Sequence, residues 1–291
     1  MRGDIHLPSH RHARLDRASR LPVVPLYTTR YGSGMENPRL AVLIDADNAS
    51  ADLIEPLLAE VAKYGVASVK RIYGDWTLPN LGPWKQKLVA HAIQPMQQFR
   101  YTTGKNATDS ALIIDAMDLL YTGNFEGFCL VSSDSDFTRL ATRLRESGKR
   151  VYGFGERKTP RSLIAACDKF IYVDILRPDA TEAEVEPAAA DAAGSTKTPA
   201  RKPAAATPKP PKPDKQLKAL FNAALDASAD DEGWAHLGSI GQYISKQQPD
   251  FDARNYGQKR LSDLVKATAG YELQTRKSAD GKASAHYMRR A

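Results

Sequence analysis

Two aspartates stand two residues apart directly after an apolar stretch of the chain. Residues 128–132 read Phe-Cys-Leu-Val-Ser and predict a short buried strand, which leads into Asp134 and Asp136 at the start of the next helix. Two carboxylates that close oppose each other's ionisation, so a positive charge is expected between them. A hard divalent cation, which takes carboxylate oxygens as ligands, is the expected occupant.

Two further aspartates are expected at the same place. Asp45 ends the run Leu-Ala-Val-Leu-Ile at 40–44, which is typical of a strand buried on both faces, and Asp109 opens the helix that leads back to the strand 127–132. In a doubly wound parallel sheet the first and fourth strands are plausible neighbours, and ligands bind beyond the carboxyl ends of the strands. Four acids without His or Cys favour Mg²⁺ or Mn²⁺ over zinc, and the matching chemistry is metal-assisted hydrolysis of a phosphodiester.

Polar residues next to these acids in the sequence are candidates for holding the scissile phosphate. They are Asn48, Lys105, Ser132 and Ser133. The competing interpretation is that an aspartate at a helix start is a cap, and for Asp109 or Asp136 taken alone this is the better one. The convergence of four acids on one edge of the sheet favours a metal site instead.

Three other aspartates near these motifs are expected to stay outside the site. Asp115 and Asp118 lie further along the helix that Asp109 opens, and we expect them to be structural or solvated. Asp47 is expected to point away from Asp45, because successive side chains of a strand alternate between its two faces.

The elements that position the acids alternate along residues 38–177. Strands are expected at 40–44, 66–74, 93–99, 127–132, 150–154 and 170–173, and helices at 51–64 (with Ser50 as its N-cap), 83–92, 108–121, 136–147 and 162–166. Strands that alternate with helices on short connections predict an α/β domain with a Rossmann-like parallel sheet flanked by helices.

The remaining segments predict a tail, a linker and a second domain. Residues 1–37 are Arg-rich at first and show no apolar period, so we expect a disordered tail or an over-extended start, with Met35 as a natural beginning. Residues 178–214 are rich in Ala, Pro and Lys and predict a disordered linker. In 215–291, helices expected at 217–225, 234–244 and 255–268, with strands at 271–276 and 285–289, predict a small winged helix.

Composition sets broad limits on the partners. The formal net charge of +7 permits a nucleic-acid partner without requiring one. Cys129 and Cys167 lie in apolar segments and are expected to be buried free thiols in a reducing cytoplasm. The sequence has no apolar run of about 18 residues, so no segment is expected to span a membrane.

Three motifs together resemble a known family. They are Leu-Ile-Asp45-Ala-Asp-Asn48, Lys105-Asn-Ala-Thr-Asp109-Ser-Ala-Leu-Ile-Ile-Asp and Leu-Val-Ser-Ser-Asp134-Ser-Asp136-Phe. In order and spacing they are similar to the NYN domain, LabA-like branch, of the PIN-like nuclease superfamily, over about residues 38–175. The resemblance implies a Rossmann-like fold, RNA hydrolysis, and Asp45, Asp109, Asp134 and Asp136 as metal-binding residues. Ser133 stands where many relatives have Gly, which would narrow the approach to the metal.

The second domain resembles the OST-HTH/LOTUS module. The resemblance rests on Trp234, Leu237 and Ile240, on the turn Asn-Tyr-Gly-Gln at 255–258, and on the closing strand Tyr-Met-Arg at 287–289. It implies binding of RNA, single-stranded in our expectation, or of a protein partner. The candidate phosphate contacts are Lys259, Arg260 and Lys266, although a solvated helix face is the ordinary fate of such residues.

Three functions compete at this stage. The first is a metal-dependent ribonuclease whose second domain tethers RNA. The second is a non-catalytic RNA-binding or regulatory protein that keeps the NYN fold. The third is a phosphatase of the haloacid dehalogenase type, because Asp45-Ala-Asp47 also follows a first strand there, although Ala49 stands where Thr or Val is typical. Hydrolysis of a small phosphate ester would separate the third function from the first.

Overall fold

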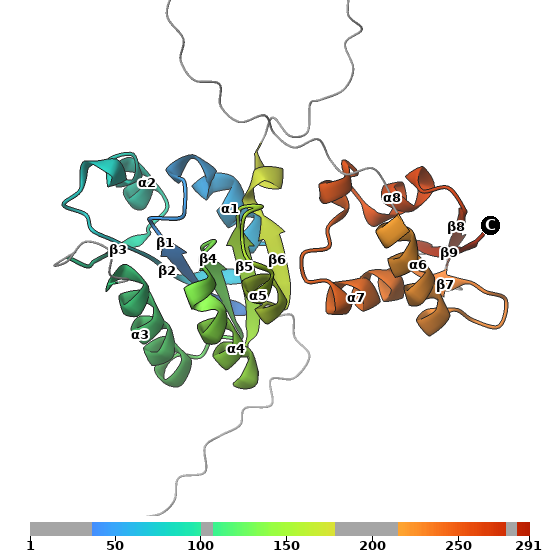
Figure 1. Cartoon of the computed structure of the whole chain (residues 1–291), viewed down its shortest axis with the longest axis horizontal. Helices are drawn as coiled ribbons and strands as arrows, with labels where there is room; N and C mark the ends of the chain where they lie inside the picture. Colours follow the sequence, from blue (N-terminus) through green and yellow to red (C-terminus); the bar gives the residue numbers. More distant parts are fainter. Residues whose placement is uncertain (1–36, 100–106, 178–214, 278–283) are drawn as a thin grey trace, which may run out of the picture. The chain divides into compact units, whose positions relative to one another are not determined.

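The structure is a computed structural model that describes residues 37–99, 107–177, 215–277 and 284–291. These residues make up two folded regions, 37–177 and 215–291, coloured blue to yellow and orange to red in Figure 1. The expected linker 178–214, nearly all of the expected tail 1–37 and the candidate residue Lys105 lie outside the described residues.

The first region is built on a sheet of six parallel strands in the order β3-β2-β1-β4-β5-β6. The strands are β1 (Arg39–Asp45), β2 (Val66–Gly74), β3 (Gln94–Gln97), β4 (Gly127–Val131), β5 (Arg150–Gly155) and β6 (Lys169–Tyr172). The expected α/β fold is confirmed, and so is the pairing of the first and fourth strands. All six carboxyl ends therefore meet at one edge of the sheet.

Helices cover both faces of this sheet (Figure 1). On one face α1 (Ile54–Val61) and α2 (Trp84–Ala90) share an apolar core with alternate residues of β1, among them Val42 and Ile44. On the other face α3 (Ala107–Thr122), α4 (Thr138–Glu146) and α5 (Arg161–Ala166) pack on Ala41 and Leu43. Because side chains alternate along a strand, Asp45 follows Ala41 and Leu43 onto the face that α3 covers.

Short 3₁₀ turns replace the first residues of two expected helices. The segment expected as one helix over 51–64 begins as η1 (Ala51–Leu53) before α1, and η3 (Ser135–Phe137) precedes α4. The 3₁₀ turns η2 (Pro79–Leu81) and η4 (Val173–Leu176) lie outside the expected helices. Ser50 is the N-cap residue, as expected, although its side chain makes no capping hydrogen bond and its backbone carbonyl accepts from Leu53 N at 3.2 Å.

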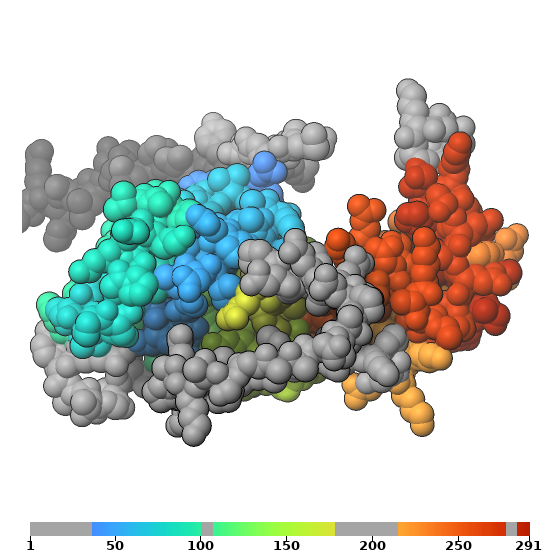
Figure 2. Space-filling model, turned by 90° about the horizontal axis from the view of Figure 1, so that it is seen from above, coloured from blue at the N-terminus to red at the C-terminus, as the bar shows by residue number. Residues whose placement is uncertain are grey.

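The second region contains helices packed on a small antiparallel sheet. Its described elements are α6 (Lys215–Ser228), β7 (Ala235–His236), α7 (Leu237–Gln247), η6 (Ala253–Tyr256), α8 (Leu261–Ala267), β8 (Tyr271–Lys277) and β9 (Ser284–Arg290), with strand order β7-β9-β8. Figure 2 shows its described side chains in orange to red. Helices followed by a hairpin agree with the expected winged helix.

Two boundaries of the second region differ from the expected ones. Trp234 was expected to open a helix, but the next two residues form β7 and α7 begins only at Leu237, where Nδ1 of His236 accepts from Gly238 N at 3.2 Å. The helix expected over 255–268 is split, because Gly257 has φ +76° and ends η6 in the left-handed conformation that favours glycine.

Two further expectations from the sequence can be compared with the structure. Cys129 and Cys167 are both buried free thiols, as expected. Burial raises the pKa of the Cys167 thiol to about 12, so it stays protonated near neutral pH. Within the described residues no helix is long and apolar enough to cross a membrane.

Candidate metal centre

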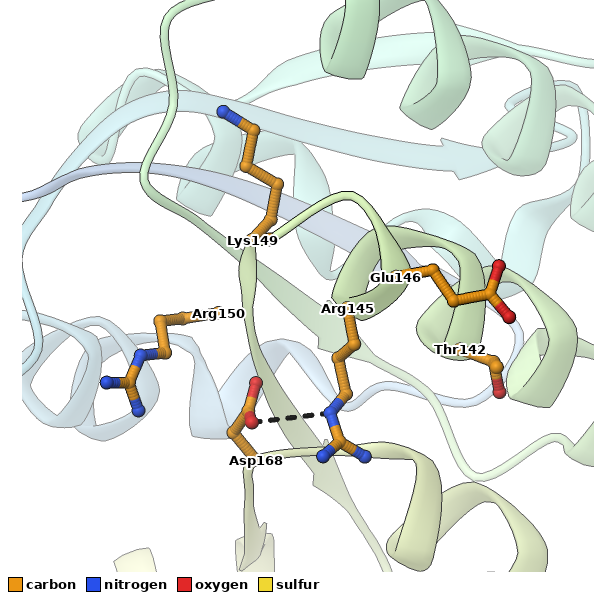
Figure 3. Close-up of a pocket in the computed structure, with 7 residues that line it drawn as sticks. Thr142, Arg145, Glu146, Lys149, Arg150 and Asp168 are labelled. Carbon is orange, nitrogen blue, oxygen red and sulfur yellow. Dashed lines mark ion pairs between the residues drawn. The ribbon is translucent and has the colours of Figure 1, made fainter.

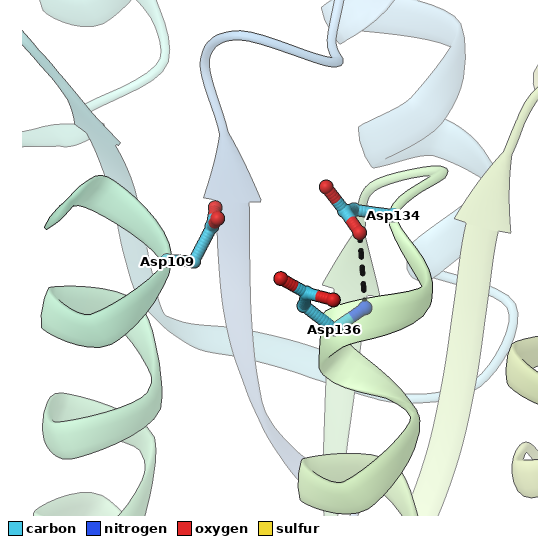
Figure 4. Close-up of side chains that lie close together, drawn as sticks. All are labelled: Asp109, Asp134 and Asp136. Atoms are coloured by element: carbon cyan, nitrogen blue, oxygen red, sulfur yellow. Dashed lines mark hydrogen bonds between the residues drawn. The ribbon is translucent and has the colours of Figure 1, made fainter. Parts of the chain in front are cut away.

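Three of the four predicted acids form one group at the carboxyl edge of the sheet. Asp109, Asp134 and Asp136 each offer a carboxylate oxygen, and these oxygens lie within 4.8 Å of one another. Figure 4 shows Asp109 pointing from α3 toward the pair at the start of η3 and α4. Asp134 is also the N-cap of η3, because its Oδ1 accepts from Asp136 N at 2.9 Å. The cap therefore fixes the two acids of the pair relative to each other.

The fourth predicted acid, Asp45, is not part of this group of three, and its carboxylate accepts hydrogen bonds from three donors. It is only 1% exposed, its Oδ1 accepts from Asp47 N at 3.0 Å, and its Oδ2 accepts from Asn48 Nδ2 at 2.7 Å and from Ser132 Oγ at 2.8 Å. The pKa of Asp45 is raised because burial disfavours the charged form more than these donors favour it. These three hydrogen bonds hold the Asp45 carboxylate in one orientation.

The register of the sheet explains why Ser132 meets Asp45. Ile44 pairs with Val131 in neighbouring parallel strands, so the next residues along, Asp45 and Ser132, lie side by side and on the same face. Ser132 Oγ also accepts from Asp134 N at 3.0 Å, and it therefore links the first acid to the second motif.

The other predicted phosphate contacts are placed differently. Asn48 is partly exposed and bound to Asp45. Ser133 is buried, and its Oγ accepts from Glu156 N at 2.8 Å, so its hydroxyl is engaged with the end of β5. Lys105 lies outside the described residues. Whether any of these residues binds a substrate stays a prediction.

The carboxylates influence one another's protonation. Burial and then the charges of Asp45, Asp134 and Asp136 raise the pKa of Asp109 to about 6. Asp47, which we expected to point away, also contributes to this rise and to that of Asp45. The strand ends at Asp45, so the alternation on which that expectation rested does not extend to Asp47.

A partly buried polar contact that we did not predict braces α3 against the sheet. Asp115 of α3 accepts hydrogen bonds from Arg71 and from the Tyr73 hydroxyl of β2. Tyr73 is 1% exposed, and burial together with the contact to Asp115 raises the pKa of its hydroxyl. Because Tyr73 also pairs with Asp45 across β1 and β2, the brace fixes the helix that carries Asp109 next to the strand that carries Asp45. Asp118, in contrast, is exposed.

The donor set of this site fits a hard divalent cation. Asp109, Asp134 and Asp136 present oxygen ligands alone, at a spacing that one ion can bridge. The pKa of Asp109 is raised first by burial and then by the charges of the neighbouring carboxylates. A bound cation would offset the charges of these carboxylates.

A shallow hollow of about 440 Å³ lies elsewhere in the same region, at the turn between α4 and β5 (Figure 3). Arg145 and Asp168 pair across it at 3.3 Å, and the same arginine donates to the carbonyls of Ala165 and Ala166 at the end of α5. The hollow adjoins the start of β5, whereas the acids lie at the edge of the sheet where the strands end. Its charged groups hold α4 and α5 together and form no part of the acidic site.

Comparison with known proteins identifies the domains. The family model described as the NYN domain matches residues 39–175, which include all four predicted acids, and the model of the OST-HTH/LOTUS domain matches residues 208–282. The LabA-like subtype is not distinguished by these matches. A comparison with curated proteins found no match.

Three solved structures resemble parts of the chain. A protein of unknown function from Vibrio parahaemolyticus is 19% identical over 49% of this chain and 97% of its own, with a TM-score of 0.42. An uncharacterised protein from Nitrosomonas europaea is 41% identical over 34% of this chain and 92% of its own (TM-score 0.26). A fragment of a Chromobacterium violaceum protein is 34% identical over 28% of this chain and 86% of its own (TM-score 0.23).

Proposed function

Since the chain carries an NYN domain, which is a nuclease-type domain, followed by an OST-HTH/LOTUS domain, a type of domain that binds RNA, we propose that it is a metal-dependent ribonuclease. The observation that carries the proposal is the meeting of Asp109, Asp134 and Asp136 within 4.8 Å. The second domain would hold RNA near this site. The LabA-like branch is part of the proposal and rests on the three acidic motifs.

The roles we assign follow from the geometry of the acids. Asp109, Asp134 and Asp136 would hold a divalent cation, Mg²⁺ or Mn²⁺, with Asp45 as the fourth carboxylate of the site. When bound, such an ion offsets the negative charge that develops on a phosphodiester during hydrolysis. Asn48 and Ser132 keep Asp45 in one orientation, because both donate to the same carboxylate oxygen. The Asp134 cap keeps Asp136 beside it, so the ligands are arranged before substrate arrives.

The phosphatase alternative fits this arrangement less well. It needs the aspartate that ends β1, Asp45, as a nucleophile that a substrate can reach. Asp45 is only 1% exposed, so a substrate phosphate has little access to its carboxylate oxygens.

The test is cleavage of an end-labelled single-stranded RNA by the full chain in Mg²⁺, in Mn²⁺ and in chelator. Asp134→Asn removes one ligand charge, and Asp118→Asn removes an exposed charge of α3 and serves as the matched control. We expect metal-dependent cleavage by the parent and by Asp118→Asn, and none by Asp134→Asn.

Other outcomes would count against the proposal in different ways. Cleavage that survives chelator, or that persists in folded Asp134→Asn, would place the chemistry elsewhere. RNA binding without cleavage under any metal condition would favour the non-catalytic regulatory protein. Hydrolysis of a small phosphate ester that depends on Asp45 would revive the phosphatase.

A further inference from the structure

The solvent side of the small sheet in the second region carries aromatic rings and arginines. Ala235 pairs with Met288, and Met288 pairs with Leu273, and all three belong to or pack on the apolar core. Because side chains alternate along each strand, the neighbours of these residues turn to the opposite side of the sheet. His236 of β7 and Tyr287 of β9, which pair with each other, lie on that outer side.

Five residues there contact one another, and we call them the ring face: Trp234, His236, Arg276, Tyr287 and Arg289. The guanidinium of Arg276 lies over the Tyr287 ring at 4.6 Å and over the Trp234 ring at 5.1 Å, and that of Arg289 lies over Trp234 at 4.7 Å. The rings of His236 and Tyr287 meet edge to face at 5.4 Å. Four of the five side chains are partly exposed and His236 is exposed. The aromatic rings and guanidinium groups of the ring face are therefore adjacent to one another and at least partly exposed to solvent.

The ring face is also positively charged. Arg289 pairs with Glu272 at 2.8 Å, but within the described residues no acidic side chain pairs with Arg276, whose Nε donates to Gln274 Oε1 at 3.0 Å. Arginine guanidiniums stack flat on aromatic rings and bind phosphate through several donors at once. A surface that combines rings with guanidiniums suits a ligand that has both flat bases and phosphates.

We propose that the ring face binds single-stranded RNA, with bases stacked on its rings and guanidiniums and phosphates held by Arg276 and Arg289. This inference rests on the proposed function, because it names the surface that holds RNA. A single strand is favoured over a duplex because only unpaired bases leave their own stack to lie on protein side chains. Base stacking on aromatic side chains needs no sequence preference, so the surface would accept many RNAs.

The ring face competes with the surface predicted from the sequence. Lys259, Arg260 and Lys266 precede or belong to α8 and are all exposed, so they offer charge. No described ring contact or cation–ring contact involves any of them. They can attract a phosphate backbone, whereas the ring face can also bind bases.

The test measures binding of a fluorescein-labelled single-stranded RNA to the full chain by anisotropy, in chelator so that no metal-dependent cleavage occurs. Three variants alter the ring face: Trp234→Ala, the pair Arg276→Ala with Arg289→Ala, and the pair Arg276→Lys with Arg289→Lys, which keeps the charge but removes the planar group. The control is the pair Lys218→Ala with Lys246→Ala, which removes two exposed charges of α6 and α7. Thermal unfolding of each variant checks that the second region is folded.

We expect Trp234→Ala and the alanine pair to raise Kd about tenfold or more, which is the usual effect of losing one stacked base. The lysine pair should also weaken binding, and the control pair should change Kd less than about threefold. The same RNA annealed to its complement should bind more weakly than the single strand.

Three results would overturn the inference: folded ring-face variants that bind like the parent, a control pair that weakens binding as much, or a duplex that binds as tightly. If Trp234→Ala is unfolded, the lysine pair decides. Cleavage of the same RNA in Mn²⁺ separates this inference from the proposed function. Cleavage that depends on Asp134 with no role for the ring face would sink this inference alone, whereas binding through the ring face without cleavage would sink only the nuclease.

Discussion

The Ser132 hydroxyl donates a hydrogen bond of 2.8 Å to Oδ2 of Asp45, although the two residues are 87 positions apart in the chain. The next residue, Ser133, uses its hydroxyl for a different purpose, because it accepts from Glu156 N at 2.8 Å. The hydroxyls of two adjacent serines in one motif therefore bond to residues at the ends of two different strands, β1 and β5. One orients an acid of the site, and the other ties the motif to the end of β5.

This contrast predicts that Ser132→Ala and Ser133→Ala lose similar stability but differ in activity. Each removes one buried hydroxyl and should lower the free energy of unfolding by about 1–3 kcal/mol, as measured in urea. Only Ser132→Ala frees Asp45, so only this variant should slow RNA cleavage, by about 10- to 100-fold, which is typical for residues that orient metal ligands. Equal loss of activity in both would show that the Asp45 contact is not what matters.

Asp134 is both a proposed metal ligand and the N-cap of η3, so we expect two substitutions at this position to differ in their effect on stability. Asp134→Asn keeps an oxygen that can accept from Asp136 N, whereas Asp134→Ala removes the cap of η3. Both should abolish metal-dependent cleavage, because both remove a ligand charge. Only Asp134→Ala should also cost stability, about 1 kcal/mol by urea unfolding. A fully active and stable Asp134→Ala would contradict both roles of this side chain.

The brace between α3 and β2 predicts a stability effect far larger than an ordinary surface change. Asp115→Ala leaves Arg71 partly buried without its acidic partner, and should lower the free energy of unfolding by about 3 kcal/mol. Tyr73→Phe removes one hydrogen bond and should cost about 1 kcal/mol. The matched control Asp118→Ala, on the same helix but exposed, should stay within about 0.5 kcal/mol of the parent. A cost at Asp115 no larger than that at Asp118 would show that the brace carries no energy.

Much of the fold followed from the sequence because its signals are local. The apolar run 40–44 and the break at Gly148 predict a strand and a helix end without reference to the rest of the chain. The convergence of Asp45, Asp109, Asp134 and Asp136 required one more rule, that parallel strands end at a common edge.

The features that sequence reasoning missed depend on distant partners or on weak local signals. The brace joins Asp115 to Arg71 across 44 positions, and no spacing within either element points to it. The strand β7 is two residues long, too short for an alternating pattern, so Trp234 was assigned to the helix that follows. For this reason the sequence did not predict the ring face. Trp234 lies on the same side of the sheet as His236 and Tyr287 only because β7 pairs with β9.

The raised pKa of Asp109 predicts how stability depends on pH when no metal is bound. Its folded-state pKa of about 6 lies above the ordinary 3.8, so between these values the folded chain binds more protons than the unfolded chain. The contribution of Asp109 to stability therefore falls as pH rises through this range, and the full penalty is present above the folded-state pKa. In chelator, Asp109→Asn should be more stable than the parent at neutral pH, by about 1 kcal/mol after solvent screening.

Urea unfolding of the two proteins at about pH 4 and at neutral pH measures this difference, which should nearly vanish at the acidic end. Asp118→Asn, which alters an exposed acid of the same helix, should show no such pH dependence. Addition of Mn²⁺ at neutral pH should raise the stability of the parent, because the ion binds only the folded state, and should raise that of Asp109→Asn much less. If the parent gained nothing from Mn²⁺, or if Asp109→Asn were the less stable protein in chelator, the three carboxylates would not be the strained ligand set of a cation.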